Sequence, residues 1–169
     1  EKDYVLGWVL AGIFNHSAVG SSWAFKGGTC LKKCYFETYR FSEDLDFTLT
    51  ESSHLNQEFL LSCLREVAQW IYNETGIDIP RDLIRFDVYR NSRGFMSAQG
   101  RIGYSGPMNP RGDLPRIRLD LTTDEILVLD PAIREVHHPY SDSPDDGIRI
   151  GSHCFEVVFA EKIRALAER

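Results

Sequence analysis

The chain has 169 residues, of which 43% are hydrophobic and 26% are charged. This size suffices for one domain whose core needs no metal, and the four cysteines, which lack Cys-x-x-Cys spacing, are expected to be free buried thiols. The net charge of −6 argues against a broadly basic nucleic-acid clamp, and the absence of a long apolar run or secretory signal predicts a cytoplasmic protein without a membrane partner.

Hydrophobic periodicity predicts a mixed order of helices and strands. Helices are expected over residues 3–14, from near Thr29, over residues 54–74 with Gly76 as terminator, and over the final residues. Strands are expected near residues 22–25, 44–49, 83–90, 95–104 and 115–121. A less regular stretch follows. Because neighbouring residues of a strand point in opposite directions, we expect the adjacent His137 and His138 there to be surface residues.

Two acids one residue apart form the first candidate site. Asp44-Leu45-Asp46-Phe47-Thr48-Leu49 alternates polar and apolar residues, so a strand here would present Asp44, Asp46 and Thr48 on one face. The two carboxylates repel one another, and a divalent cation with oxygen ligands would neutralise them. The alternative is an edge strand with a solvated acidic face, which explains an isolated Asp-x-Asp better.

A glycine pair upstream favours the metal interpretation. Gly27-Gly28 follows the apolar run Trp23-Ala24-Phe25 and precedes a helix that begins near Thr29. A strand, a tight turn and a helix N-terminus form a natural anion site, because the first-turn N–H groups lack partners within the helix. Thr29 from this side, and Ser42 from the other, are candidates to bond a phosphate oxygen. An ordinary glycine turn is the alternative, since no Walker or dinucleotide-binding fingerprint occurs.

These motifs resemble the AbiEii/AbiGii toxin family of nucleotidyltransferases, which is related to the DNA polymerase β superfamily. The resemblance rests on residues 25–29, 40–47 and 160–166, and the opening residues 1–6 are also similar. It implies an α+β, nucleotidyltransferase-like domain over residues 1–169, with a mixed twisted sheet flanked by helices. It also implies a toxin that has a cognate antitoxin and transfers NMP from an NTP to an acceptor hydroxyl, with RNA or tRNA as the acceptor.

The superfamily uses a third carboxylate on a strand beside the first two. In the run of residues 115–121, alternation places Asp120 on a polar face with Arg116 and Arg118, which makes it the best candidate. The alternative for Asp120 is a surface ion pair with one of these arginines. Asp87 is the second candidate for the third carboxylate.

The last helix contributes Lys162. Its buried stripe is predicted at Phe159, Ile163 and Leu166, and Lys162 lies off this stripe, where a solvated lysine is the default explanation. The resemblance implies instead that Lys162 contacts the nucleotide's phosphates. It further implies Mg²⁺, or Mn²⁺ in its place, on Asp44, Asp46 and Asp120, which with Lys162 form the catalytic set. The implied nucleotide-binding residues are Lys26, Gly27, Gly28, Thr29, Ser42 and Lys162.

The arginines fall into two groups along the chain. These are Arg81, Arg85, Arg90 and Arg93, and then Arg101, Arg111, Arg116 and Arg118. A positive rim around an acidic metal centre would suit a polyanionic acceptor. The alternative, which we favour from the sequence, is that these arginines pair with the excess acids.

Two other classes of function remain open. A non-catalytic nucleotide-binding or interaction module would retain the acids without turnover, and a metal-dependent phosphodiesterase would use similar carboxylates, more often with clustered histidines. The chain begins with Glu1, and its final helical pattern reaches Arg169 without a Gly, Asn or Pro stop. We therefore expect a longer protein, whose C-terminal helical continuation is missing here.

Overall fold

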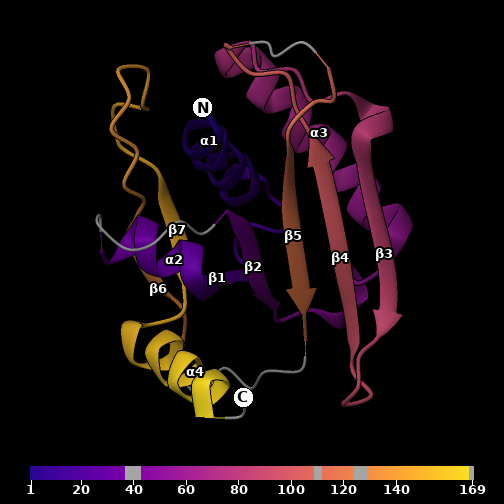
Figure 1. The fold of residues 1–169 in the computed structure, drawn as a ribbon, viewed down its shortest axis with the longest axis vertical. Helices are drawn as coiled ribbons and strands as arrows, with labels where there is room; N and C mark the ends of the chain where they lie inside the picture. The colour runs from indigo at the N-terminus through magenta and orange to yellow at the C-terminus, as the bar shows by residue number, and fades with distance from the viewer. Residues whose placement is uncertain (37–42, 109–111, 124–128, 168–169) are drawn as a thin grey trace.

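The computed structural model describes residues 1–36, 43–108, 112–123 and 129–167, with the backbone alone for residues 162, 165 and 166. A seven-stranded mixed sheet has the order β3-β4-β5-β2-β1-β7-β6 (Figure 1). Its strands are β1 (Trp23–Lys26), β2 (Asp44–Leu49), β3 (Ile84–Arg90), β4 (Met96–Gly103), β5 (Arg116–Thr122), β6 (Ala132–Glu135) and β7 (Arg149–Ser152). The helices are α1 (Lys2–Asn15), α2 (Gly27–Cys34), α3 (Gln57–Thr75) and α4 (Phe155–Ala167). The predicted α+β fold with a mixed sheet and flanking helices is confirmed.

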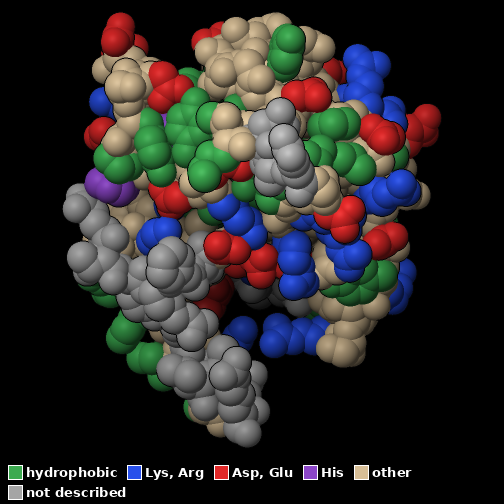
Figure 2. Space-filling view, turned by 45° about the horizontal axis from the view of Figure 1, so that its top comes forward, with side chains coloured by type: hydrophobic (Ala, Val, Ile, Leu, Met, Phe, Trp, Pro, Cys, Tyr) green, Lys and Arg blue, Asp and Glu red, His purple; other side chains and the backbone are tan. Residues whose placement is uncertain are grey.

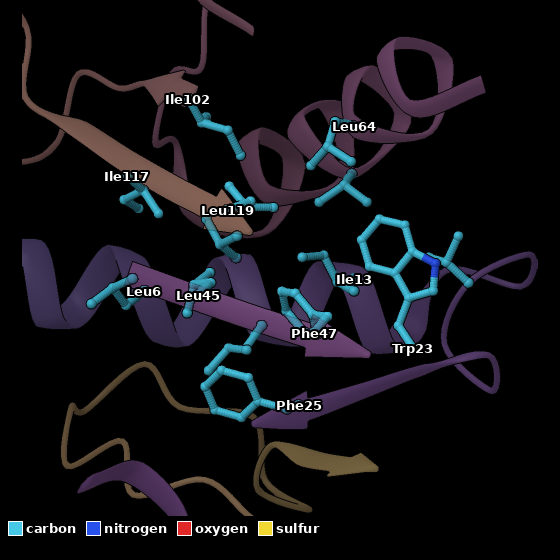
Figure 3. Packing of buried hydrophobic residues seen from close by; sticks show 14 of the residues in the cluster. Leu6, Ile13, Trp23, Phe25, Leu45, Phe47, Leu64, Ile102, Ile117 and Leu119 are labelled. Carbon is cyan, nitrogen blue, oxygen red and sulfur yellow. The ribbon is translucent and has the colours of Figure 1, made fainter. Parts of the chain in front are cut away.

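One face of the sheet is apolar and is covered by α1 and α3, whereas α2 and α4 lie on the other side (Figure 1). Helix α1 is buried continuously from Val5 to Ile13, as expected for a helix that is apolar all round. Figure 3 shows Leu45 and Phe47 of β2 in this core, together with side chains from α1, α3 and β5. Because β2 buries its odd-numbered residues here, its aspartates must project from the opposite face.

Helix α3 begins and ends with standard capping residues. The side chain of Asn56 accepts a hydrogen bond from the backbone N–H of Phe59 at 3.0 Å, and Gly76 follows the helix with a φ of 75°. The predicted terminator is therefore confirmed. The helix starts later than expected because residues 52–54 form a separate short turn, Ser52–His54.

The stretch that was expected to be irregular contains β6 and β7. Strand β7 pairs in parallel with β1 through Phe25 and Ser152, and β6 pairs antiparallel with β7. Each of these strands has only four residues, so local periodicity gives little sign of them. In the described structure β6 pairs with β7, the next strand along the chain, and β7 pairs with β1, which is distant in sequence, so tertiary pairing joins both to the sheet.

The expectation that both adjacent histidines are surface residues is wrong for His138. Its ring is 7% exposed, lies among Tyr4, Trp8 and Tyr140, and its nitrogens have no hydrogen-bond partner in the described structure. Burial lowers the pKa of His138 to about 4, so the ring is neutral at physiological pH. His137 is exposed, as predicted.

The predicted buried stripe of the last helix is also wrong in its described positions. Phe159 is 48% exposed and Ile163 is 52% exposed, whereas Val158 is 2% exposed. Helix α4 is therefore buried at Val158, whereas Phe159 and Ile163 face outward. The thiols are free as expected, although only Cys30 and Cys63 are buried. Within the described ranges, no helix combines the length and hydropathy that a bilayer-spanning segment needs.

Candidate active site

The two aspartates of β2 project from the polar face of the sheet. Asp44 and Asp46 are half-buried, whereas Leu45 and Phe47 between and beyond them are fully buried. Thr48 shares the polar face but is 1% exposed. The alternation that was predicted from the sequence therefore holds for both acids.

Strand pairing brings Asp120 beside Asp46. In the parallel pair of β2 and β5, Asp46 is opposite Asp120, and Asp44 is opposite Arg118. Adjacent strands are about 4.8 Å apart, so the side chains of Asp46 and Asp120 leave the sheet as close neighbours. On the other side, Lys26 of β1 is opposite Asp46. The sheet thus forms one polar row across β1, β2 and β5.

Gly27 brings the start of α2 against Asp46. Its φ is +78°, and a Cβ built on it would lie 2.1 Å from Oδ2 of Asp46. Only glycine satisfies both conditions, because other residues rarely adopt this φ and their Cβ would displace the carboxylate. Gly28 follows as the second residue of α2. The carboxylate of Asp46 therefore lies against the first residue of a helix N-terminus.

Thr29 connects α2 to β2 through a hydrogen bond. Its side chain is fully buried, and its hydroxyl donates a hydrogen bond to the backbone carbonyl of Asp44 at 2.6 Å. The helix begins two residues before Thr29, with Lys26 at the N-cap position and no capping hydrogen bond from the Lys26 side chain. Thr29 is therefore a first-turn residue that fixes the position of the helix relative to Asp44.

The hydrogen-bond partner of Asp120 is an uncharged side chain. The side-chain amide of Gln99 on β4 donates a hydrogen bond to Oδ1 of Asp120 at 3.0 Å. The alternative of an ion pair with Arg116 or Arg118 is not observed in the described structure. Sequence reasoning missed Gln99, because its approach to Asp120 depends on the register of β4 against β5. Asp87 lies in the same row beyond Gln99, two strands from Asp120 and about 10 Å away at the usual strand spacing.

A partly buried ion-pair cluster fixes the other end of α2. The ammonium groups of Lys32 and Lys33 lie 2.8 and 3.0 Å from the carboxylate of Asp3 on α1. Burial of Asp3 opposes its ionisation, but hydrogen bonds and charges from both lysines outweigh burial and hold its pKa at about 2. Burial lowers the pKa of Lys33. This cluster anchors α2 to α1, so the N-terminus of α2 has a defined position beside the carboxylates.

The side chains of two predicted site residues are not described by the structure. Ser42 lies outside the described residues, and Lys162 lies in α4 with its backbone alone described. Among the residues with described placement, no group of three or more His, Cys, Asp or Glu side chains converges as a metal site. The structure brings together Asp46 and Asp120, with Asp44 two residues from Asp46 along β2. Two carboxylates match the manner in which Mg²⁺ is bound with waters and substrate phosphates as its remaining ligands.

Comparison with known proteins gives a family and a fold. The family model for the nucleotidyl transferase AbiEii toxin of type IV toxin–antitoxin systems matches residues 8–169. The crystal structure of JHP933 from Helicobacter pylori has a TM-score of 0.55 and 17% sequence identity to this chain. The match covers 96% of this chain and 56% of that chain, so this chain spans little more than half the length of that protein.

At this identity, the likeness to JHP933 concerns the fold alone. No curated protein in the comparison matches this chain. The family match extends over nearly the whole chain and includes β1, α2, β2 and β5, which form the candidate site. The protein therefore belongs to the nucleotidyl transferase AbiEii toxin family of type IV toxin–antitoxin systems.

Proposed function

We propose that the protein transfers a nucleoside monophosphate from an NTP to an acceptor hydroxyl of RNA, with tRNA as the first acceptor to test. The observation that carries the proposal is the position of Asp46 between Gly27 and Asp120. A carboxylate that can hold a phosphate-bound cation lies against a helix N-terminus on one side and a second carboxylate on the other. This arrangement suits NTP binding and activation of a hydroxyl at neighbouring points.

The glycine turn would hold the triphosphate. The N–H groups of a first helical turn have no acceptor within the helix, and they and the dipole of α2 favour phosphate oxygens near Gly27 and Gly28. Lys26 is opposite Asp46, and this position supports a contribution of positive charge from its side chain. Thr29 contributes indirectly, because its hydrogen bond to the backbone of Asp44 fixes the position of α2. By family resemblance, Ser42 and Lys162 complete the phosphate contacts.

The carboxylates would bind the cation and accept the acceptor's proton. Asp44 and Asp46 are the proposed Mg²⁺ ligands, with Mn²⁺ as a substitute, and Asp120 completes the set. When bound, the metal supplies charge neutralisation for the attacking and leaving oxygens. Asp120 takes the proton from the acceptor hydroxyl, and the hydrogen bond from Gln99 orients its carboxylate. The new bond joins the acceptor oxygen to the α-phosphorus, and pyrophosphate leaves.

The biological setting follows from the family. A type IV toxin–antitoxin system includes an antitoxin, and we propose that a cognate antitoxin protein limits this activity in the cytoplasm, where NTPs and RNA are abundant. Which NTP and which RNA end are used depends on contacts with the base and the acceptor.

Incubation of the full-length protein with each α-labelled NTP, total RNA and Mg²⁺ tests the proposal. Label transferred to RNA, and its loss with Asp46→Asn, is the expected result. Nucleotide bound without transfer would support a non-catalytic module. Shortened RNA without label would support a phosphodiesterase.

A further inference from the structure

Four exposed arginines lie on the polar face of β3, β4 and β5. Arg85, Arg101 and Arg118 are directly opposite one another on adjacent strands, and Arg116 follows in the next row opposite Gly103. The residues between them, such as Phe86, Ile102 and Ile117, are buried on the other face. We call Arg85, Arg101, Arg116 and Arg118 the arginine face. Figure 2 shows Lys and Arg side chains beside the central acids, over the β5, β4 and β3 part of the sheet.

Acids lie near the arginine face, with Asp44 opposite Arg118 and Asp87 two residues from Arg85, but the described structure shows no ion pair between them. In the described part of the chain, none of its guanidinium groups forms an ion pair or a side-chain hydrogen bond, although the whole chain has an excess of acids. The expectation that these arginines pair with acids is therefore wrong for this group. Like charges in directly opposed positions of adjacent strands destabilise a sheet. A bound polyanion would relieve this repulsion.

We infer that the arginine face binds the phosphates of a single-stranded polynucleotide whose acceptor hydroxyl lies beside Asp120. This inference rests on the proposed nucleotidyl transfer and adds the surface that holds the acceptor. Arg118 is two residues from Asp120 on the same strand face, a separation of about 7 Å along a strand. The positive row therefore begins immediately beside the carboxylates.

The order of the strands separates the two substrates. An in-line displacement requires the attacking and leaving oxygens on opposite sides of the phosphorus. The glycine turn that would hold the leaving pyrophosphate follows β1, whereas Asp120 and the arginine face extend from β5 to β3 in the other direction. The triphosphate thus lies on the β1 side of Asp46, and the acceptor approaches across β5.

An exposed tyrosine distinguishes a nucleic acid from an acidic protein. Tyr89 is 46% exposed and lies on the same sheet face as Arg85 and Asp87, at the position opposite Ser97. Bases stack on exposed aromatic rings without requiring a particular sequence, whereas an acidic peptide gains little from such a ring. Arginine rows with a stacking platform therefore favour a single-stranded polynucleotide.

Binding of a fluorescein-labelled single-stranded RNA of mixed sequence to the full-length protein tests the inference by anisotropy over a range of salt concentrations. The double variant Arg85→Gln/Arg101→Gln should weaken binding about tenfold or more. Its salt slope should fall by about 1.4, because each phosphate contact with a single strand contributes about 0.7. Tyr89→Ala should weaken binding about fivefold without changing the slope. The matched control is Arg65→Gln, an exposed arginine on α3, which covers the opposite face.

The outcomes separate this inference from the proposed function. If the double variant binds RNA with the same affinity and slope as Arg65→Gln, the arginine face is not the acceptor surface, even if label transfer occurs. If the double variant instead loses its thermal stabilisation by Mg²⁺ and NTP, the arginines hold the triphosphate and the inference is overturned. If poly-glutamate displaces the labelled RNA as effectively as unlabelled RNA does, the arginine face would be assigned to an acidic protein instead. If the wild type binds RNA as expected but transfers no label, the proposed function fails while the binding surface stands.

Discussion

Asp46 is the residue at which the two halves of the candidate site meet. Its carboxylate lies against Gly27, and its strand neighbour across β5 is Asp120. A carboxylate in this position is useful only if a cation or a lysine offsets its charge, since a second acid is adjacent. Asp46 is therefore the most informative single position in the site.

Asp46→Asn should abolish the rise in melting temperature that Mg²⁺ and NTP cause together. The reason is that a ligand selective for the folded state stabilises it only while its site is intact. The variant should remain folded, since relief of the repulsion from Asp120 offsets lost contacts. Differential scanning fluorimetry would measure both effects, with Asp82→Asn, an exposed acid, as control. Unfolding of Asp46→Asn without metal would make the acid structural and contradict its assignment.

Gly27 offers a separate prediction about the turn. Gly27→Ala combines a strained φ with a collision against Oδ2 of Asp46, so we expect a loss of about 1–3 kcal/mol in the free energy of unfolding. Gly94→Ala is the matched control, because Gly94 has a φ of +87° and open space around its Cβ position. Urea denaturation compares the two variants. Equal losses in the free energy of unfolding for the two variants would show that the collision with Asp46 adds nothing to the effect of the strained φ.

At the scale of elements, α2 must be fixed at both ends to present its N-terminus. Thr29 joins it to β2, and Lys32 and Lys33 join it to Asp3 of α1. The pKa of Asp3 is held at about 2, below its ordinary value of 3.8. This depressed pKa contributes stability that is present above its ordinary value and is lost as pH falls through about 2.

Asp3→Asn should therefore lower the melting temperature at neutral pH. It should also remove part of the loss of stability that the wild type undergoes between about pH 4 and about pH 2. The buried Lys33 would also lose its counter-charge, which adds to the destabilisation at neutral pH. Thermal melts across this pH range are the measurement, with the exposed Asp146→Asn as control. Parallel pH profiles for Asp3→Asn and wild type would contradict the role of this cluster.

Local patterns predicted the elements that carry the candidate site, and tertiary pairing explains what they missed. The alternation in β2, the glycine turn and the Asp120 strand depend on neighbouring residues, so periodicity was sufficient to find them. Strands β6 and β7, by contrast, are short and join the sheet through β1, which is distant in sequence. Gln99 reaches Asp120 only through the β4–β5 register. The outward positions of Phe159 and Ile163 on α4 and the burial of His138 likewise depend on which surfaces pack together.

At the scale of the whole molecule, one face of the sheet packs on the hydrophobic core and the other carries the candidate site. Helices α1 and α3 bury its apolar face, while the polar face carries the acids, the glycine turn and the arginine face in strand order. A single sheet can therefore present one substrate on each side of Asp46.

Asp120 gives the most direct test of the central claim, which is that this sheet positions a hydroxyl beside a metal-bound NTP. Label transfer from NTP to RNA should be measured for the full-length wild type and Asp120→Asn, alongside calorimetric titration of each with Mg²⁺ and NTP. We predict that Asp120→Asn retains at least part of the metal-dependent NTP binding but lowers transfer by about a hundredfold or more, the usual scale for loss of a positioned base. Normal transfer by Asp120→Asn would contradict the account and make Asp87 the next acid to test.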